Sequence, residues 1–369
     1  MIEKISIKNY KSIKTLEFKI GRVNVLIGEN GCGKTNILEA IGLISAAAED
    51  KLDNEFLANR GIRVSEAIFM RSAFDELSVS EPIEISVFGG GTDFKSTLQN
   101  DNKPYSKWKN GLIAGNKSEL INYLNELEEK GQIKGGDEIT PDIFKGFINK
   151  KIKNLDIKGY MIYSPENKAL RTFDKEGQIE PLGINGEGLL KLLKFYKVKN
   201  DEKLIQIKKE LELIDWFGDL DLPEDMSDGD TNLRIKDRYI HENLPFFSQK
   251  NVNEGFLFLL FYVTLFINKE TPSFFAIDNI EASLNPKLCT ELIKKIAVLS
   301  EKYNKQVIMT SHNPAILDGF NLNDPMQKIF VVSRNKLGHT RIREIKKPET
   351  AENEEPVKLS EAFLNGMLG

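Results

Sequence analysis

The sequence predicts an α/β fold, and three observations lead to this prediction. Short β-branched and apolar runs, such as residues 23–27, are typical of buried parallel strands. Apolar residues at helical spacing follow this run, over residues 37–44. Between strand and helix lies a loop of the form G-x-x-x-x-G-K-T, which consists of Gly28-Glu29-Asn30-Gly31-Cys32-Gly33-Lys34-Thr35. The order of strand, glycine-rich loop and helix predicts a P-loop NTPase.

The glycine-rich loop predicts a binding site for a nucleoside triphosphate with Mg²⁺. Glycines let the backbone wrap close to a polyphosphate, and successive N–H groups and the helix N-terminus point at its negative charge. Lys34 is expected to reach the β and γ phosphates, and Thr35 to place its hydroxyl on Mg²⁺. We include Asn36, the next residue, in the expected site. The expected nucleotide is ATP, because the sequence has no Asn-Lys-x-Asp element of the kind that reads guanine.

Composition limits the class of protein. The 369 residues have a net charge of −4, so no global basic field attracts nucleic acid. The longest apolar run, residues 256–267, is too short to span a bilayer, and the N-terminus lacks the apolar core of a signal peptide. Two cysteines, Cys32 and Cys289, do not make a disulfide framework. We therefore expect a cytoplasmic protein with no membrane partner.

The N-terminal half is expected to contain part of the ATPase domain and an insertion. Residues 2–7 and 16–20 alternate like an antiparallel pair, and residues 83–87 like a half-buried strand. A helix is expected over residues 36–48. From residue 95 to 158 Lys, Asn, Glu and Gly dominate, and short helices are expected at 120–127 and 143–152. We expect ATPase residues at 1–94 and an inserted helical lobe at 95–158.

The C-terminal half is expected to complete the ATPase domain over residues 159–345. Helices are expected at 189–196, 201–217, 256–267 and 288–299, and strands at 160–163, 233–239, 274–277 and 307–309. Residues 329–332 and 340–344 indicate a hairpin, and residues 219–230 an acidic surface loop. A charged linker and a short apolar helical stripe at 359–368 are expected within residues 346–369.

Two polar residues follow neighbouring core strands in this half. Asp278 ends an apolar strand, where a Walker B aspartate would hold the Mg²⁺ shell. His312 follows the next core strand, where a histidine can sense the γ phosphate. A single histidine after a strand also has an ordinary structural interpretation, but its place one strand after Asp278 favours the functional one.

The chain resembles the ABC-type ATPases of the RecF/SMC/OLD group, the stand-alone "AAA family ATPases" of bacterial genomes. Three segments carry the resemblance: I-x-N-Y-K-S-I running into L-I-G-E-N-G-C-G-K-T-N-I-L-E-A-I, then F-F-A-I-D-N-I-E-A-S-L-N-P, and V-I-M-T-S-H-N-P. Weaker similarities lie at residues 163–171 and 183–189. The resemblance implies an ABC-type ATPase head with a mixed sheet and a helical insertion.

In this family two heads dimerise around ATP, and each phosphate loop meets the partner's signature segment. The resemblance assigns that role to Asn253-Glu254-Gly255, although the family usually has Ser or a second Gly in place of Asn253. A short polar side chain at a helix N-terminus can still meet a γ phosphate. An ordinary helix cap is the alternative interpretation. Residues 283–285 correspond to the loop that crosses the dimer interface.

Asn279 departs from the family pattern, which has Glu after the Walker B aspartate as the general base. An amide cannot accept a proton at neutral pH, and loss of a general base lowers a rate by about 10²–10⁴. Glu281 matches a second acidic position of the OLD-like subgroup and is a candidate replacement. The catalytic candidates are therefore Asn279, Glu281 and His312, and we expect tight ATP binding with slow turnover.

Two functions remain open. The first is a regulatory ATPase that forms a dimer or a higher oligomer around ATP and controls a separate nuclease or toxin, as in antiphage defence. About 57 residues follow His312, which is too few for the Toprim nuclease domain of OLD-like proteins. The second is a RecF-like DNA-binding repair ATPase, whose candidate contacts are Lys145, Lys150, Lys151, Lys153, Lys191, Lys194, Lys197 and Lys199. A kinase or metabolic P-loop enzyme is disfavoured, because it lacks a signature helix before the Walker B strand.

Overall fold

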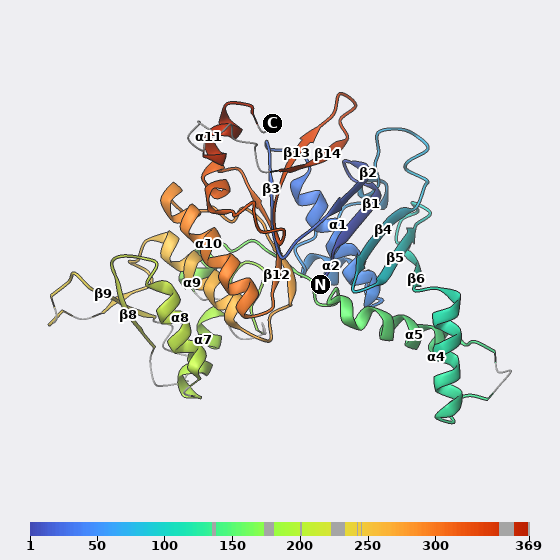
Figure 1. Ribbon diagram of the computed structural model, residues 1–369, viewed down its shortest axis with the longest axis horizontal. Coiled ribbons are helices and arrows are strands. Elements are labelled where there is room, and N and C mark those ends of the chain that lie inside the picture. Colours follow the sequence, from blue (N-terminus) through green and yellow to red (C-terminus); the bar gives the residue numbers. More distant parts are fainter. Residues whose placement is uncertain are drawn as a thin grey trace. The chain divides into compact units, whose positions relative to one another are not determined.

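The computed structural model describes residues 1–134, 138–172, 181–199, 201–222, 233–241, 243–244, 246–346 and 358–367. The chain divides into two compact units, and many of their elements are labelled in Figure 1. The first unit contains residues 1–21, 28–160 and 330–344, and the second contains residues 22–27, 161–329 and 345–369. The predicted linker after Lys346, residues 223–230 of the predicted acidic loop, and Leu368 lie outside the described residues.

A five-stranded antiparallel sheet forms the centre of the first unit, in the order β2-β1-β4-β5-β6. Its strands are β1 (Lys4–Tyr10), β2 (Ile13–Lys19), β4 (Ile83–Gly89), β5 (Thr92–Gln99) and β6 (Lys109–Ala114). Alternate residues, among them Ile5, Ile7, Ile83, Ile85 and Val87, are buried. This period of two confirms the predicted N-terminal pair and the predicted strand at 83–87.

Strands β5 and β6 show that the predicted helical lobe at residues 95–158 also contains strands. Residues 95–99 and 109–114 lie in the sheet, and helices begin only with α4 (Lys117–Glu129) and α5 (Pro141–Ile152), followed by the 3₁₀ helix η1 (Lys153–Leu155). A capping box of Asn116 and Glu119 starts α4, and Thr140 caps α5 with Pro141 at its first position. The helices expected at 120–127 and 143–152 are confirmed.

Helix α1 (Lys34–Ala48) packs on β1, β4, β5 and β6 within this unit (Figure 1). It is buried on nearly all sides, because its non-polar residues surround the helix rather than forming one stripe. The short helices α2 (Asn54–Ala58) and α3 (Ala67–Met70) follow it. Strands β13 (Gln327–Arg334) and β14 (Thr340–Ile345) are neighbours, which confirms the predicted hairpin.

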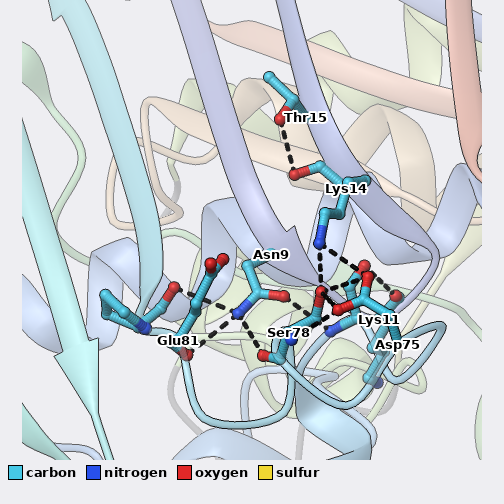
Figure 2. A network of polar contacts seen from close by, with 9 residues as sticks. Asn9, Lys11, Lys14, Thr15, Asp75, Ser78 and Glu81 are labelled. Carbon is cyan, nitrogen blue, oxygen red and sulfur yellow. Dashed lines mark hydrogen bonds and ion pairs between the residues drawn. The ribbon is translucent and has the colours of Figure 1, made fainter.

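A polar network fixes the turn between β1 and β2 (Figure 2). Asn9 has a φ of 60°, and its side-chain amide donates to the carbonyl oxygens of Ser78 at 2.8 Å and Glu81 at 3.0 Å. Lys14 donates to Asp75 at 3.0 Å. Hydrogen bonds from the Ser78 hydroxyl, and then from Lys14, hold the pKa of the Asp75 carboxyl well below its usual range. The turn that precedes the phosphate loop is therefore anchored to the segment before β4.

Four parallel strands run through the second unit in the order β3 (Val23–Ile27), β12 (Gln306–Ser311), β11 (Phe274–Ile277) and β7 (Ile162–Tyr163). Every residue of these strands is buried, as expected for strands that read as continuous apolar runs. Ser311 pairs with Ile27, and Met309 with Ile277. Because the strands are parallel, β3, β11 and β12 end at the same edge of the sheet.

The helices of the second unit include α9 (Glu254–Ile267) and α10 (Pro286–Lys302), which flank β11 in sequence. Helix α9 is buried along almost its whole length, and α10 is amphipathic. The unit also contains α6 (Asn167–Thr172), α7 (Leu189–Val198), α8 (Glu202–Leu211), η2 (Pro314–Gly319) and α11 (Leu359–Leu364). No helix in the described ranges is long and apolar enough to cross a membrane.

A small antiparallel sheet corrects one helix boundary. The helix expected over residues 201–217 ends at Leu211, because residues from Phe217 onward form β8 (Phe217–Asp221). β8 pairs with β9 (Arg234–Asp237), which pairs with β10 (Phe247–Ser248). The predicted apolar stripe at the end of the chain forms α11, which packs on η2. There the backbone N–H of Ser360 donates to Asp318 at 2.9 Å.

Candidate nucleotide site

The loop at residues 28–35 adopts a conformation that only glycine allows at several positions. Gly31 and Gly33 have φ values of +75° and +107°. A Cβ on Gly33 would lie 2.1 Å from the hydroxyl oxygen of Thr340, and a Cβ on Gly28 would lie 2.1 Å from the carbonyl oxygen of Val332. At Gly28 and Gly33 the backbone therefore lies closer to its protein neighbours than a residue with a side chain permits.

The Lys34 ammonium folds back over this loop. The residue is 4% exposed, and its Nζ donates to the carbonyl oxygens of Gly28 at 2.7 Å and Glu29 at 3.0 Å. Thr35 and Asn36 follow it in the first turn of α1. Phosphate oxygens attract an ammonium more strongly than neutral carbonyls do, so a bound triphosphate can replace these two hydrogen bonds.

A chain of hydrogen bonds, which the sequence did not predict, supports the loop from outside. The Asn36 amide donates to the Ser12 hydroxyl at 2.7 Å, and the Ser12 and Thr340 hydroxyls are 2.7 Å apart. Thr340 donates to the carbonyl oxygen of Cys32 at 2.9 Å. Because Thr340 has a single hydroxyl proton, Ser12 is the donor between the two. The chain thus runs from α1 through the β1–β2 turn and β14 back to the loop.

A second unpredicted cluster lies on α1 around Glu39, which is fully buried. Its carboxylate accepts from Lys11 Nζ and from Arg63 Nε, both at 2.6 Å. Arg63 Nη2 also donates to the Asn36 side-chain oxygen at 3.3 Å. Burial, acting against the attraction of Glu39, lowers the pKa of Lys11. This cluster joins α1 to the segments on either side of the phosphate loop.

In the second unit, Asp278 directly follows β11. Its backbone N–H donates to the carbonyl oxygen of Tyr163 at 2.8 Å, and its carboxylate accepts from the Thr310 hydroxyl on β12. Asp278 is half-buried, so its carboxylate lies at the surface of the sheet edge where β3 and β12 also end. The sequence located Asp278 but assigned no role to Thr310.

The three catalytic candidates lie in the two segments that follow β11 and β12. Asn279 is exposed and has a φ of 54°, a left-handed conformation that Asn tolerates better than most residues. Glu281 is half-buried, and its Oε1 accepts from the backbone N–H of His312 at 2.6 Å. His312 itself is exposed. The structure therefore joins Glu281 to the segment that contains His312, a contact that the sequence did not predict.

The predicted signature segment, residues 253–255, begins α9. The Asn253 side chain caps the helix by accepting from the N–H of Phe256 at 2.9 Å, so the capping interpretation holds whether or not the segment also meets a nucleotide. A surface cavity of about 520 Å³ adjoins Gly255 and is also lined by Ser283 and Asn285. A Cβ on Gly255 would lie 3.0 Å from the Ser283 carbonyl oxygen. The segment and the predicted interface loop are thus close together.

The two weaker sequence similarities also meet. The N–H of Ser164 donates to the carbonyl oxygen of Ile184 at 2.7 Å, and the N–H of Glu166 to that of Asn185 at 2.8 Å. The Glu187 carboxylate accepts a hydrogen bond from the backbone N–H of Asn185 at 3.0 Å, which stabilises the turn within residues 183–189. Both segments lie in the second unit, and the first of them begins at the end of β7.

Comparison with known families assigns the chain to one of them. A family model described as "AAA domain, putative AbiEii toxin, Type IV TA system" matches residues 23–318, which is most of the chain. The chain belongs to this family. The matched range begins at β3 and includes the phosphate loop, the signature segment, Asp278 and His312. The expected ABC-type ATPase of the RecF/SMC group is confirmed.

Curated relatives are similar over part of their length. The DNA replication and repair protein RecF of Rickettsia typhi is 28% identical, and that of Rickettsia bellii strain OSU 85-389 is 31% identical, each over 160 residues. These matches cover 42% of this chain and 40% of each RecF protein, so the chain spans well under half of these relatives. An uncharacterized protein of Methanocaldococcus jannaschii, MJECL10, is 34% identical over 113 residues, which are 29% of this chain and 50% of that protein.

Solved structures show the same fold over nearly the whole chain. An Smc head bound to the C-winged helix domain of ScpA aligns with a TM-score of 0.59 and 16% identity, covering 94% of this chain and 97% of that one. An Smc head domain with an extended coiled coil, bound to the C-terminal domain of ScpA derived from Pyrococcus furiosus, aligns with a TM-score of 0.54 and 15% identity, covering 94% and 96%. The fold is that of an ABC-type ATPase head.

Proposed function

We propose that the chain binds ATP with Mg²⁺ through residues 28–36 and Asp278. The left-handed backbone of Gly31 and Gly33 and the buried Lys34 ammonium support the phosphate half of this site. Thr35 and Asp278 offer the oxygen ligands that Mg²⁺ prefers, and the ion would neutralise charge on the phosphates. His312 and the signature residues Asn253, Glu254 and Gly255 are proposed to sense the γ phosphate.

The proposed activity is a slow ATPase that acts as a switch, and Asn279 is the observation that carries it. The residue stands directly after Asp278, is exposed, and has an amide where a general base is needed. Glu281, the nearest alternative base in the sequence, has one oxygen engaged by the His312 N–H. Slow hydrolysis keeps the ATP-bound form populated, which suits regulation better than motor activity.

The proposed assembly is a homodimer around ATP that controls a separate effector, a nuclease or toxin, in antiphage defence. The adjoining signature segment and the loop at 283–285 support the dimer, since both line one cavity. The family description names a toxin and a type IV TA system, which supports a defence role.

Binding of a fluorescent ATP analogue and the ATP-dependent oligomeric state test this proposal. Wild type is expected to bind with Mg²⁺ and to form a dimer whose mass is measured by light scattering. Lys34→Ala is expected to lose both, and Lys130→Ala, which alters a lysine outside the loop, serves as the control. Retention of both properties by Lys34→Ala would refute the site.

DNA binding is the second candidate function, because the RecF relatives are named for DNA replication and repair. Several of its candidate lysines already form ion pairs: Lys145 with Asp50, Lys150 with Glu126, Lys151 with Glu119, and Lys197 with Asp221. These carboxylates offset the charge that would meet phosphates. Duplex binding that falls steeply between low and moderate salt would favour this function, and no binding at low salt would exclude it.

A further inference from the structure

Thr310 makes two hydrogen bonds that converge on the end of the Walker B strand. It lies on β12 and is fully buried. Its hydroxyl donates to Asp278 Oδ1 and accepts from the backbone N–H of Asn279 at 2.9 Å. The Thr310 carbonyl oxygen accepts from the N–H of Ile280 at 3.1 Å. One residue of β12 therefore contacts three consecutive residues after β11.

These contacts fix the direction of the hydroxyl proton. Because the Asn279 N–H occupies a lone pair of the Thr310 oxygen, the single proton is directed to the carboxylate. Thr310 is β-branched and surrounded by the core, so its χ1 angle has little freedom. The same bond to the Asn279 N–H holds that residue at its left-handed φ of 54°.

We propose that Thr310 is a positioning residue that orients the Asp278 carboxylate for Mg²⁺. The hydroxyl holds Asp278 Oδ1, and this restricts the rotation of the carboxylate that would bind the ion. Residues that orient a metal ligand in this way typically change metal affinity by about 10–100-fold when they are altered. The inference rests on the proposed ATP–Mg²⁺ site.

Titration of Mg²⁺ against binding of a fluorescent ATP analogue tests this role in the full chain. Thr310→Val keeps the shape and removes the hydroxyl, and it is expected to raise the half-saturating Mg²⁺ concentration by about 10-fold or more. Analogue binding measured in EDTA is expected to stay at the wild-type level. Thr310→Ser, which keeps the hydroxyl, is expected to restore the wild-type Mg²⁺ dependence.

The matched control is Thr264→Val. Thr264 is also fully buried in the second unit, but its hydroxyl donates to the Leu260 carbonyl oxygen at 2.7 Å, within α9 and away from Asp278 in the sequence. This variant is expected to lose stability without changing the Mg²⁺ dependence. If Thr310→Val shows no cooperative melting, Thr310→Ala provides a second hydroxyl-free variant for the same titration.

Asp278→Asn distinguishes a failure of the role of Thr310 from a failure of the proposed ATP–Mg²⁺ site. Asp278→Asn is expected to need more Mg²⁺ than wild type. If it does, but Thr310→Val and Thr310→Ala need no more Mg²⁺ than wild type, the role of Thr310 is overturned and the proposed nucleotide site stands. An unchanged requirement in Asp278→Asn, or no analogue binding by the wild type, would overturn the proposed nucleotide site itself.

Discussion

The backbone N–H of His312 lies 2.6 Å from Glu281 Oε1 and donates a hydrogen bond to it. The second oxygen of this carboxylate, Oε2, is buried and has no hydrogen-bond partner among the described residues. Burial of the thiol, and then the charge of Glu281, raises the pKa of Cys289 to about 11. Glu281 therefore links the segment after β11 to the backbone of His312, and this engagement argues against its serving freely as a base.

Asn279→Glu is expected to accelerate ATP turnover by at least about 10-fold, because a positioned general base contributes about 10²–10⁴. Asn279 is exposed, so the longer side chain has room. Steady-state phosphate release with saturating Mg²⁺ measures the effect. Asn279→Gln is the matched control, because it has the length of Glu without a base, and it is expected to remain slow.

Glu281→Gln tests whether Glu281 acts as the general base in place of the glutamate that Asn279 replaces. The amide oxygen can still accept from the His312 N–H, so the local fold is kept. We expect wild-type turnover in this variant and fast turnover in the Asn279→Glu, Glu281→Gln double variant. If wild type hydrolyses ATP rapidly and Glu281→Gln abolishes this activity, Glu281 is the general base. The protein is then not a slow switch.

Local patterns predicted most of the second unit, and the reason is burial. β3, β11 and β12 are buried on both faces and α9 on all sides, so each contains a run of mostly apolar residues. Asp278 and His312 were found because they end or follow such runs. Thr310 carried a weaker signal, since a threonine in a strand has ordinary β propensity and its partners are defined only by pairing with β11.

Prediction from local sequence patterns failed where contacts between distant residues determine the structure. In β5 the inward residues are Phe94, Ser96 and Leu98, so a serine interrupts the apolar alternation. The hydroxyl of Ser96 donates to the side-chain oxygen of Asn110 on β6 at 2.9 Å. This bond provides a partner for the buried hydroxyl, but the sequence around Ser96 does not reveal it. Thr340 supports the phosphate loop from the far end of the chain, and no spacing rule connects such distant positions.

Gly33→Ala is expected to abolish binding of the ATP analogue and to lower stability. Its Cβ would overlap the Thr340 hydroxyl, and the φ of +107° is strained for any L side chain by about 1–3 kcal/mol. Gly31→Ala is the control: its φ is +75°, but no atom lies within 4 Å of its Cβ. Thermal unfolding should show the larger loss for Gly33→Ala, and equal losses would contradict the support role of Thr340.

Glu39→Ala is expected to destabilise the protein by about 3–5 kcal/mol, because it leaves the mostly buried Lys11 ammonium without its carboxylate partner. The Arg63 side chain is 67% exposed, so its charge adds little to this loss. Asp50→Asn provides the comparison. Asp50 pairs with Lys145 at the surface, with side chains 67% and 59% exposed, and such pairs contribute about 0–1 kcal/mol. Urea unfolding measures both. A loss below about 1 kcal/mol for Glu39→Ala would mean that the cluster adds little to stability.

Lys305 is expected to make stability depend on pH. It is 3% exposed, its Nζ donates to the Thr271 carbonyl oxygen at 2.7 Å, and burial lowers its pKa from 10.5 to about 8. Between these values the unfolded chain holds a proton that the folded chain has lost, so the contribution of Lys305 to stability rises with pH. Each pH unit in this window is worth about 1.4 kcal/mol.

Lys305→Met isolates this contribution, because other titrating groups are common to both proteins. The stability of wild type relative to Lys305→Met is expected to be flat below pH 7 and to increase by roughly 2 kcal/mol between pH 8 and 10. Urea unfolding at a series of pH values gives the difference. A difference that stays constant up to pH 10 would show that the Thr271 carbonyl keeps the ammonium charged in the folded protein, with a pKa near that of the unfolded chain.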